Sequence, residues 1–422
     1  MKATIKALAA AGLAALANAA SATPTVKIDS VAQRWPWNNK IDITYTIGEG
    51  TDLASGTYYK AVFIANIGGQ ICEIDGSKDL LAKTTTGQHT VTWTNAPSGV
   101  KAMDCRMGAK LYETSAYYMI VDLDTGNFAF DGLEGADTPT AVPTASNARY
   151  NTDLYKTDRL VLRRVPRTSN AADAYSAGYP TGHSDYTYNQ PTNWITAADY
   201  FIGVFDMTIA QYAKIMGLAA SSSKVPKNSI SWNTLRASKE PATTLDSSAT
   251  SGSVFERLNA LAGLRGFDLP TSVMHEIAER AGVTGRYWWN GNNTGWDYYQ
   301  VDTTLYTGTW DQQFLGSPGY NVNIKAVGNT KSNLWGLFDS VGNVRKLLRD
   351  GAALYSTDLN AVADAFTPAA FASGSKNALA RGGSIKLSAS DASFRASKRE
   401  PWDRGIGHDQ FGFRASFHFE AP

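Results

Sequence analysis

The stretch from residue 378 to residue 416 constrains the fold of this chain more than any other. It contains two short signatures, Arg-Gly-Gly-Ser at 381–384 and Gly-Phe-Arg at 412–414. Between them the sequence shows neither a helical period nor a strand period. We therefore predict that this span is rich in loops and that it presents Trp402 and His408.

Three earlier stretches complete a pattern that extends over residues 154–422. They are YFIGVFDMTIAQYAKIMG at 200–217, FDLPTSVMHEIAERAG at 267–282 and NLWGLFDSVGNVRKLLRD at 333–350. In this order, and followed by the C-terminal signatures, they resemble the formylglycine-generating enzyme family, also called the sulfatase-modifying-factor family. The resemblance implies an α+β fold, namely the loop-rich, C-type-lectin-like fold of that family.

The same resemblance implies a reaction that we do not expect this chain to perform. Enzymes of the family oxidise a sulfatase cysteine or serine to formylglycine, and the aerobic members hold copper(I) with two cysteines. Such a soft ion requires thiolate ligands. With Arg399 in register, the two cysteine positions fall on Asp391 and Ala396. The only cysteines, Cys72 and Cys105, lie before the matched region. We therefore predict a pseudoenzyme.

The N-terminus predicts export. Residues 1–22 carry Lys2 and Lys6, then a short apolar run over 7–17, then small residues, which is typical of a secretory signal peptide. The run is too short to span a bilayer. We expect a secreted or extracytoplasmic protein, in the periplasm or at the cell surface, without a transmembrane segment. A formal net charge of +1 gives no electrostatic footprint for nucleic acid.

Cys72 and Cys105 form an even pair in a chain predicted to be exported. A disulfide between them is the default expectation in an oxidising compartment. It would close a loop of moderate length and stabilise the fold by about 3 kcal/mol through chain entropy.

Residues 23–133 show strand patterns. The clearest is the strict alternation of apolar and polar residues over 41–47, as in a half-buried strand. Short runs of this kind, separated by turn residues, predict a small all-β sandwich of immunoglobulin-like type. The other runs cover residues 58–65, 89–94, 109–114 and 116–123.

Residues 134–153 are rich in Thr, Ala, Pro and Asn and lack periodicity, so we interpret them as a linker. A second domain then covers 154–422 and opens with a strand at 159–165. Apolar residues at helical spacing, each preceded by a capping residue, predict three structural helices in it. These helices follow Thr208, Ser253 and Thr271.

The stretch 339–346 corresponds to an ion site in the family. The resemblance implies calcium ligands at Asp339, Gly342 and Val344, but the final position, a glutamate in the family, is Lys346. A hard cation needs oxygen ligands, which an ammonium cannot supply. We expect Lys346 to place its own charge near Asp339 and to replace the ion, so that no cofactor is bound; calcium remains the alternative.

Two further predictions concern charged and metal-binding groups. Arg381 and Arg414 lie inside the C-terminal signatures, and we interpret them as members of buried ion pairs rather than as substrate anchors. The histidines show no paired spacing and have no cysteine near them, so we expect no zinc or iron site.

Two long irregular segments, 283–332 and 400–411, are candidates for ligand binding, since long loops in compact domains usually carry function. Aromatic and hydrogen-bonding side chains in both segments suit a sugar, a peptide or a protein partner. The alternative is that about half of the aromatics fill the core. The candidate ligand-binding residues are Trp288, Trp289, Trp296, Tyr299, Trp402, Arg404, His408 and Asp409.

These observations predict an exported, non-catalytic protein for binding a protein or carbohydrate ligand, or for assembly at a surface. Two alternatives stay open. The chain could be a sulfatase-modifying enzyme that acts without the cysteine pair, or a structural subunit of an extracellular assembly formed with other copies of itself.

Overall fold

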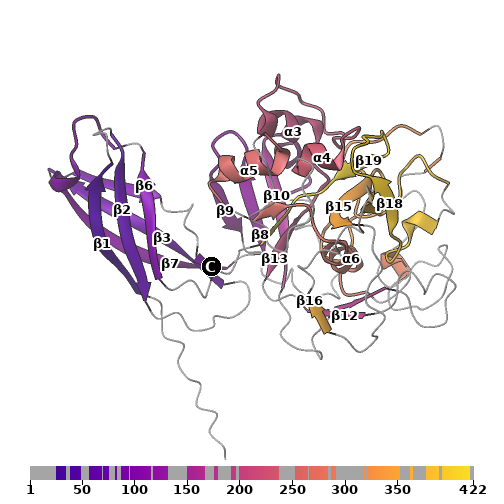
Figure 1. Ribbon diagram of the computed structural model, residues 1–422, viewed down its shortest axis with the longest axis horizontal. Coiled ribbons are helices and arrows are strands. Elements are labelled where there is room, and N and C mark those ends of the chain that lie inside the picture. The colour runs from indigo at the N-terminus through magenta and orange to yellow at the C-terminus, as the bar shows by residue number, and fades with distance from the viewer. Residues whose placement is uncertain are drawn as a thin grey trace, which may run out of the picture.

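A computed structural model gives the fold, and its mixed α+β architecture is built mostly of strands (Figure 1). None of the helices among the described residues has the length and apolar content needed to cross a membrane. The predicted signal peptide and most of the predicted linker lie outside those residues. The structure describes residues 25–34, 39–48, 57–68, 70–75, 81–82, 87–94, 96–115, 117–131, 150–166, 175–178, 192–195, 199–236, 252–264, 266–283, 287–290, 315, 318–319, 322–351, 362–364, 377–388 and 392–418.

The strands before residue 116 form two sheets that share one apolar core. Ile43 and Tyr45 are fully buried and face Phe63 of the other sheet, with the Tyr45 and Phe63 rings 4.9 Å apart. This agrees with the alternation that predicted a half-buried strand, whereas the immunoglobulin-like type stays a prediction. One sheet has the order β1 (Thr25–Gln33), β2 (Ile41–Gly48), β6 (Gly87–Trp93); the other contains β3 (Thr57–Ile67), β4 (Gln70–Asp75), β5 (Leu81–Ala82) and β7 (Cys105–Ser115).

The strand order separates the two cysteines. Cys72 on β4 is opposite Ala65 of β3, and Cys105 on β7 is opposite Ile67 on the other edge of β3. Two strand spacings, roughly 10 Å, therefore lie between their backbones. A disulfide joins Cα atoms less than about 7 Å apart. The disulfide predicted between Cys72 and Cys105 therefore does not fit this arrangement. The sequence could not show this, because it does not reveal that β3 lies between the strands of the two cysteines.

A six-stranded antiparallel sheet forms the centre of the second part of the chain. Its fully buried side chains include Phe201 and Phe417, which face each other across neighbouring strands. The strand predicted over 159–165 is confirmed. In order, the sheet contains β14 (Phe267–Asp268), β20 (Ser416–His418), β13 (Tyr200–Gly203), β10 (Arg159–Val165), β8 (Tyr118–Asp122) and β9 (Phe128–Asp131).

One strand predicted for the sandwich belongs to this sheet instead. The run at 116–123 forms β8, and β8 pairs with β10 from Arg159↔Asp122 to Arg163↔Tyr118. The alternation of apolar residues over 116–123 correctly predicted a strand. A strand of either sheet would show the same alternation. The pattern therefore could not show which sheet the strand joins.

The described residues form two further sheets in this part of the chain, and the four-stranded one contains residues of both C-terminal signatures. In the four-stranded sheet β15 runs parallel to β19 and antiparallel to β17. The order of its strands is β18 (Glu400–Asp403), β17 (Asn377–Arg381), β15 (Arg345–Gly351), β19 (Phe411–Phe413), and that of the three-stranded sheet is β11 (Tyr175–Ala177), β12 (Thr192–Ile195), β16 (Val362–Asp364).

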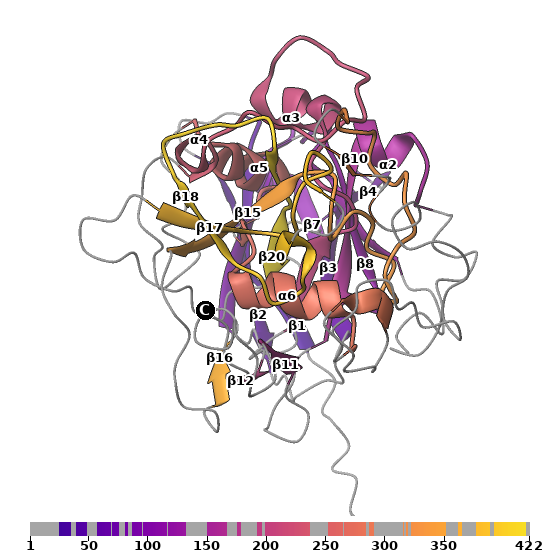
Figure 2. The ribbon, with the colours of Figure 1, turned by 90° about the vertical axis from the view of Figure 1, so that its right-hand side faces the viewer.

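The three predicted helices are confirmed, together with their caps. The Thr208 side chain accepts from the backbone N–H of Gln211, whose own side chain accepts from the Thr208 N–H, which completes a capping box. Figure 2 shows α3, α4 and α5 gathered together, while α6 lies apart from them and contacts β11, β15 and β17. Among the described residues, the helices are α2 (Leu154–Thr157), α3 (Ile209–Met216), α4 (Trp232–Arg236), α5 (Val254–Ala262) and α6 (Ser272–Arg280), with short 3₁₀ turns η2 (Ala102–Asp104), η5 (Trp288–Asn290) and η6 (Ala392–Phe394).

Candidate functional site

The segment 400–411, which we call the 400–411 loop, begins with strand β18, although the sequence predicted no regular structure there, and it ends at the first residue of β19. It gathers three aromatic rings. The indole of Trp402 stacks on the ring of Phe411 at 4.3 Å between centroids and an interplanar angle of 28°. The His408 imidazole meets the Trp402 ring edge-on at 5.5 Å. Offset and edge-on arrangements of this kind add stability beyond the burial of area. The buried Phe411 ring therefore holds the Trp402 and His408 rings in a defined arrangement at the surface.

Hydrogen bonds to a neighbouring segment fix the backbone of this loop. The carbonyl of Arg404 accepts from the N–H of Asn233 at 3.0 Å, and that of His408 accepts from the N–H of Ser229 at 3.1 Å. Within the loop, the Trp402 indole Nε1 donates to the carbonyl of Ile406 at 2.8 Å. Because these hydrogen bonds fix several points of the loop, its conformation is set before any ligand binds.

At Gly407 the loop runs so close to its neighbour that a side chain would collide with it. A Cβ atom on Gly407 would lie 2.9 Å from the carbonyl carbon of Ser229. Only glycine permits this approach.

Charged groups lie beside the rings and are open to solvent. The side chains of His408 and Asp409 are 44% and 46% exposed, with His408 Nδ1 3.0 Å from the carboxylate. Lys386 donates to Asp409 at 2.6 Å. This hydrogen bond, helped by the charges of Lys386 and His408, lowers the pKa of Asp409. The carboxylate is thus ionised at neutral pH and can accept further hydrogen bonds.

A second ion pair, between Arg345 and Glu400, fixes the start of the loop. Arg345 lies 2.6 Å from Glu400 and its guanidinium stands 5.3 Å from the centre of the Phe411 ring. Sequence reasoning missed Arg345 and the buried Phe411 ring as supports of Trp402 and His408. The only available signal was the position of Phe411 directly before the Gly-Phe-Arg signature.

The two described tryptophans of the other long segment lie away from the solvent, in the core. Trp288 and Trp289 are 2% and 0% exposed and pack in the core, with Trp289 stacked on Tyr287 at 4.9 Å. Their prediction as ligand-binding residues is therefore wrong, because a fold poor in regular structure uses them as core. Trp296 and Tyr299 lie outside the described residues.

Lys346 is the last residue of the stretch 339–346, to which the resemblance assigns an ion site, and its side chain lies in the protein interior. It is fully buried, and its Nζ donates to the carbonyl of Gly342 at 2.7 Å and lies 3.6 Å from Asp206. Burial lowers the pKa of Lys346, while the charges of Asp206 and Asp339 oppose that effect. Val344 is buried as well. The expectation that the ammonium replaces an ion beside Asp339 stays a prediction, with which the contact to Gly342 is compatible.

Asp339 is held by donors of the protein. Its carboxylate accepts from the N–H of Gly328 at 2.7 Å and from the Thr330 hydroxyl at 3.3 Å. Within the described part of the chain, no group of three or more His, Cys, Asp or Glu side chains could hold a metal ion.

The two signature arginines form buried ion pairs, as predicted. Arg414 lies 3.1 Å from Asp206 and donates to the carbonyl of Gly203 at 2.6 Å. Arg381 lies 2.7 Å from Glu276. Both arginines are 1% exposed, so they link strands and helices instead of facing a substrate.

The position that the resemblance assigns to one family cysteine is part of this packed interior. Ala396 is fully buried, and its carbonyl accepts from the Arg381 guanidinium at 2.6 Å. Asp391, at the other cysteine position, lies outside the described residues. A methyl group at Ala396 offers no metal ligand and no nucleophile.

The α6 helix holds a buried acid that sequence reasoning did not single out. Glu279 and His275 are each 1% exposed, and His275 Nδ1 lies 3.6 Å from Glu279 Oε2. Neither carboxylate oxygen of Glu279 has a hydrogen-bond partner among the described groups. Burial raises the pKa of Glu279 to about 8. The spacing of four residues on one helix was the signal that could have revealed the pair.

Comparison with known proteins shows which family this chain resembles. The FGE-sulfatase profile, described as the sulfatase-modifying factor enzyme 1-like domain, matches residues 166–417. Among solved structures, the Treponema denticola variable protein 1 aligns with a TM-score of 0.44 and 17% identity, covering 61% of this chain and 95% of its own. CarF aligns with a TM-score of 0.37 and 14% identity, covering 61% of this chain and 99% of its own. No curated protein matches.

Proposed function

The chain belongs to the family of sulfatase-modifying factor enzyme 1-like domains, and on this premise we propose that it is an exported, non-catalytic binding protein. Its ligand is a protein or a carbohydrate, and it binds at the 400–411 loop. The proposal separates the scaffold from the reaction, because a fold hosts many functions and the site decides among them.

The observation that carries the proposal is the fixed pair of solvent-accessible rings, Trp402 and His408, which the buried Phe411 supports. Trp402 and His408 present apolar ring surface, and Asp409 beside them offers charged oxygens. Recognition sites combine rigid aromatic side chains with a few placed polar groups. Exposed Ile406, with 51% of its surface open, extends the apolar part.

The sequence of the matched domain supports the absence of the family's oxidation. Neither cysteine of the chain lies within residues 166–417. Ala396 adds only a methyl group to a packed interior. Without cysteines the matched domain has no thiolate pair to hold copper(I) and no thiol to bind a substrate cysteine.

A binding screen with matched variants tests the recognition role. The purified full chain is applied to a glycan array and to an array of extracellular proteins. We expect the Trp402→Ala and His408→Ala variants to lose at least tenfold in affinity for whatever the parent protein binds. Leu218→Ala, which removes a 58% exposed apolar side chain from another surface, serves as the control. Equal binding by all variants would refute a ligand site at the loop.

Since Trp402 packs on the core, His408→Ala keeps the screen informative even if Trp402→Ala unfolds. A separate measurement tests catalysis. The protein is incubated with copper(I), oxygen and a cysteine-containing sulfatase-type peptide, and mass spectrometry detects any aldehyde. We expect none above the background of the peptide alone. Formylglycine formation by this chain would overturn the non-catalytic part of the proposal and leave the binding part to the screen.

A further inference from the structure

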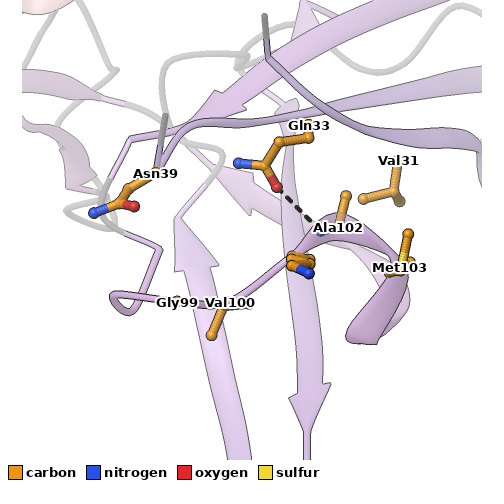
Figure 3. A pocket seen from close by; sticks show the side chains of 8 residues that line it. Val31, Gln33, Asn39, Gly99, Val100, Ala102 and Met103 are labelled. Carbon is orange, nitrogen blue, oxygen red and sulfur yellow. Dashed lines mark hydrogen bonds between the residues drawn. The ribbon is translucent and has the colours of Figure 1, made fainter. Parts of the chain in front are cut away.

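A cavity of about 610 Å³ opens in the N-terminal β-sheet region, far along the chain from the 400–411 loop (Figure 3). This volume lies within the range of small-ligand sites in proteins. The described residues that line it come from the end of β1, from the segment before β2 and from the segment that contains η2. They are Val31, Gln33, Asn39, Gly99, Val100, Lys101, Ala102 and Met103.

The floor of this cavity is apolar and open. Val31, Val100 and Ala102 are half-buried and pack against the core between the two sheets. Met103 beside them is 85% exposed, the largest exposed fraction among the large apolar side chains that the structure describes. An exposed methionine over an open apolar floor leaves apolar area in water that a ligand could cover.

A single side chain holds the walls together. The Gln33 Oε1 accepts from the N–H of Ala102 at 3.2 Å, and its Nε2 donates to the carbonyl of Lys40 at 3.2 Å. Figure 3 shows the first of these bonds, which joins Gln33 to the segment that contains Ala102. Because the amide of Gln33 is satisfied at both ends, the cavity is shaped before a ligand binds, which lowers the entropic cost of binding.

Two polar groups of the lining stay unused. The side chains of Asn39 and Lys101 are exposed and form no hydrogen bond or ion pair within the described part of the chain. In Figure 3 Asn39 is drawn on the side opposite to Val31 and Met103. Among the described lining residues Lys101 is the only charged one. The cavity thus combines an apolar part with a positive charge that forms no ion pair with another described residue.

We propose that this cavity binds a small amphipathic acid, with its apolar chain on Val100 and Met103 and its carboxylate at Lys101. An ammonium and a carboxylate form a charge-assisted hydrogen bond, while the chain covers the apolar floor. A cationic amphiphile of the same length would meet the charge of Lys101 and bind poorly. The inference is independent of the function proposed for the 400–411 loop.

The test uses the full chain and the fluorescent apolar anion 1-anilinonaphthalene-8-sulfonate. We expect octanoate to displace the probe and octylamine to leave it bound. Lys101→Glu and Met103→Ser should each weaken probe binding at least tenfold. Lys27→Glu, an exposed lysine on β1, and Leu218→Ser, an exposed apolar residue on another surface, are the matched controls and should bind as the parent does.

Hydrogen exchange locates the site directly. Octanoate should slow amide exchange in residues 99–103 of the parent protein and should not do so in Met103→Ser. Both substituted side chains are exposed, so the variants are expected to fold. Equal displacement by octanoate and octylamine, unchanged affinity in Lys101→Glu and Met103→Ser, or protection elsewhere in the chain would each overturn the proposal.

Discussion

Replacing Glu279 by glutamine is predicted to stabilise the protein at neutral pH. The carboxyl group is 1% exposed and lies on the last turn of α6, where its oxygens find no donor among the described groups. The charged form would also oppose the negative end of the helix dipole. His275, its neighbour at 3.6 Å, gives no help, because burial lowers the pKa of this imidazole well below its usual value.

The size of the effect follows from the pKa. Burial raises the pKa of Glu279 from 4.5 to about 8, so the folded protein keeps the proton that the unfolded chain releases. The stability contributed by the bound proton is complete below pH 4.5 and is lost as the pH rises towards 8. Each unit is worth about 1.4 kcal/mol, so at pH 7 the loss is on the order of 3 kcal/mol. Glutamine has no proton to lose and avoids this loss.

The assay is urea unfolding of the parent and of Glu279→Gln at several pH values between 4.5 and 9. The difference in unfolding free energy cancels the other titrating groups and isolates this one. We expect the difference to be smallest near pH 4.5, to grow in favour of Glu279→Gln up to about pH 8, and to level off above it.

Glu276→Gln is the matched control on the same helix. Burial alone would raise the pKa of Glu276, but the positive charges of Arg381 and Arg280 outweigh burial. The net effect is a pKa below the usual value. Its contribution is therefore present at neutral pH and is lost on acidification, so Glu276→Gln should destabilise near pH 7 and less so towards pH 3. A flat difference for Glu279→Gln across pH 5–8, or a less stable Glu279→Gln variant at pH 8, would refute the reasoning.

Three further outcomes are expected. Lys346→Glu should unfold at a lower temperature without calcium and regain stability in millimolar calcium, whereas the parent should not respond; equal responses would contradict the replaced ion. Arg381→Ala leaves Glu276 buried without its partner and should cost about 3–5 kcal/mol in urea unfolding. Gly126→Ala would place a Cβ 1.9 Å from a backbone carbonyl and should cost more than ~2 kcal/mol, while Gly99→Ala, with open space around it, should cost about 1 kcal/mol.

Local sequence signals predicted the regular elements of this fold well. Thr208, Ser253 and Thr271 each cap the helix that the sequence assigned to them. Capping depends on residues within one turn of the helix, and therefore a short window contains all the information. The strand at 41–47 was predictable for the same reason, since its alternation records one buried and one open face.

Contacts between distant segments were predicted less well. The sequence does not show that β3 lies between Cys72 and Cys105, nor that β8 joins β10. The ligand-binding role predicted for Trp288 and Trp289 was wrong for a related reason. An aromatic run without periodicity is equally compatible with a surface and with a core. In each case the missing information was which partner a segment packs against, and no local pattern contains it.

Arg381 and Arg414 show that a distant contact is predictable when a motif fixes it. Both arginines stand in the family's signatures, and the resemblance supplied the buried environment that the residues alone could not. The pocket around Lys101 is the opposite case: no motif marks it, and only the folded chain brings β1 and η2 together.

The calcium prediction rests on a balance of buried formal charges that the structure makes visible. Around Gly342 the carboxylates of Asp206 and Asp339 are matched by the cations of Lys346 and Arg414. A glutamate in place of Lys346 would leave three carboxylates against one guanidinium, an excess of two negative charges in a region with almost no access to water. Such an excess is costly unless an ion neutralises it. A divalent cation does so with oxygen ligands already present, which is why calcium should rescue Lys346→Glu and leave the parent unchanged.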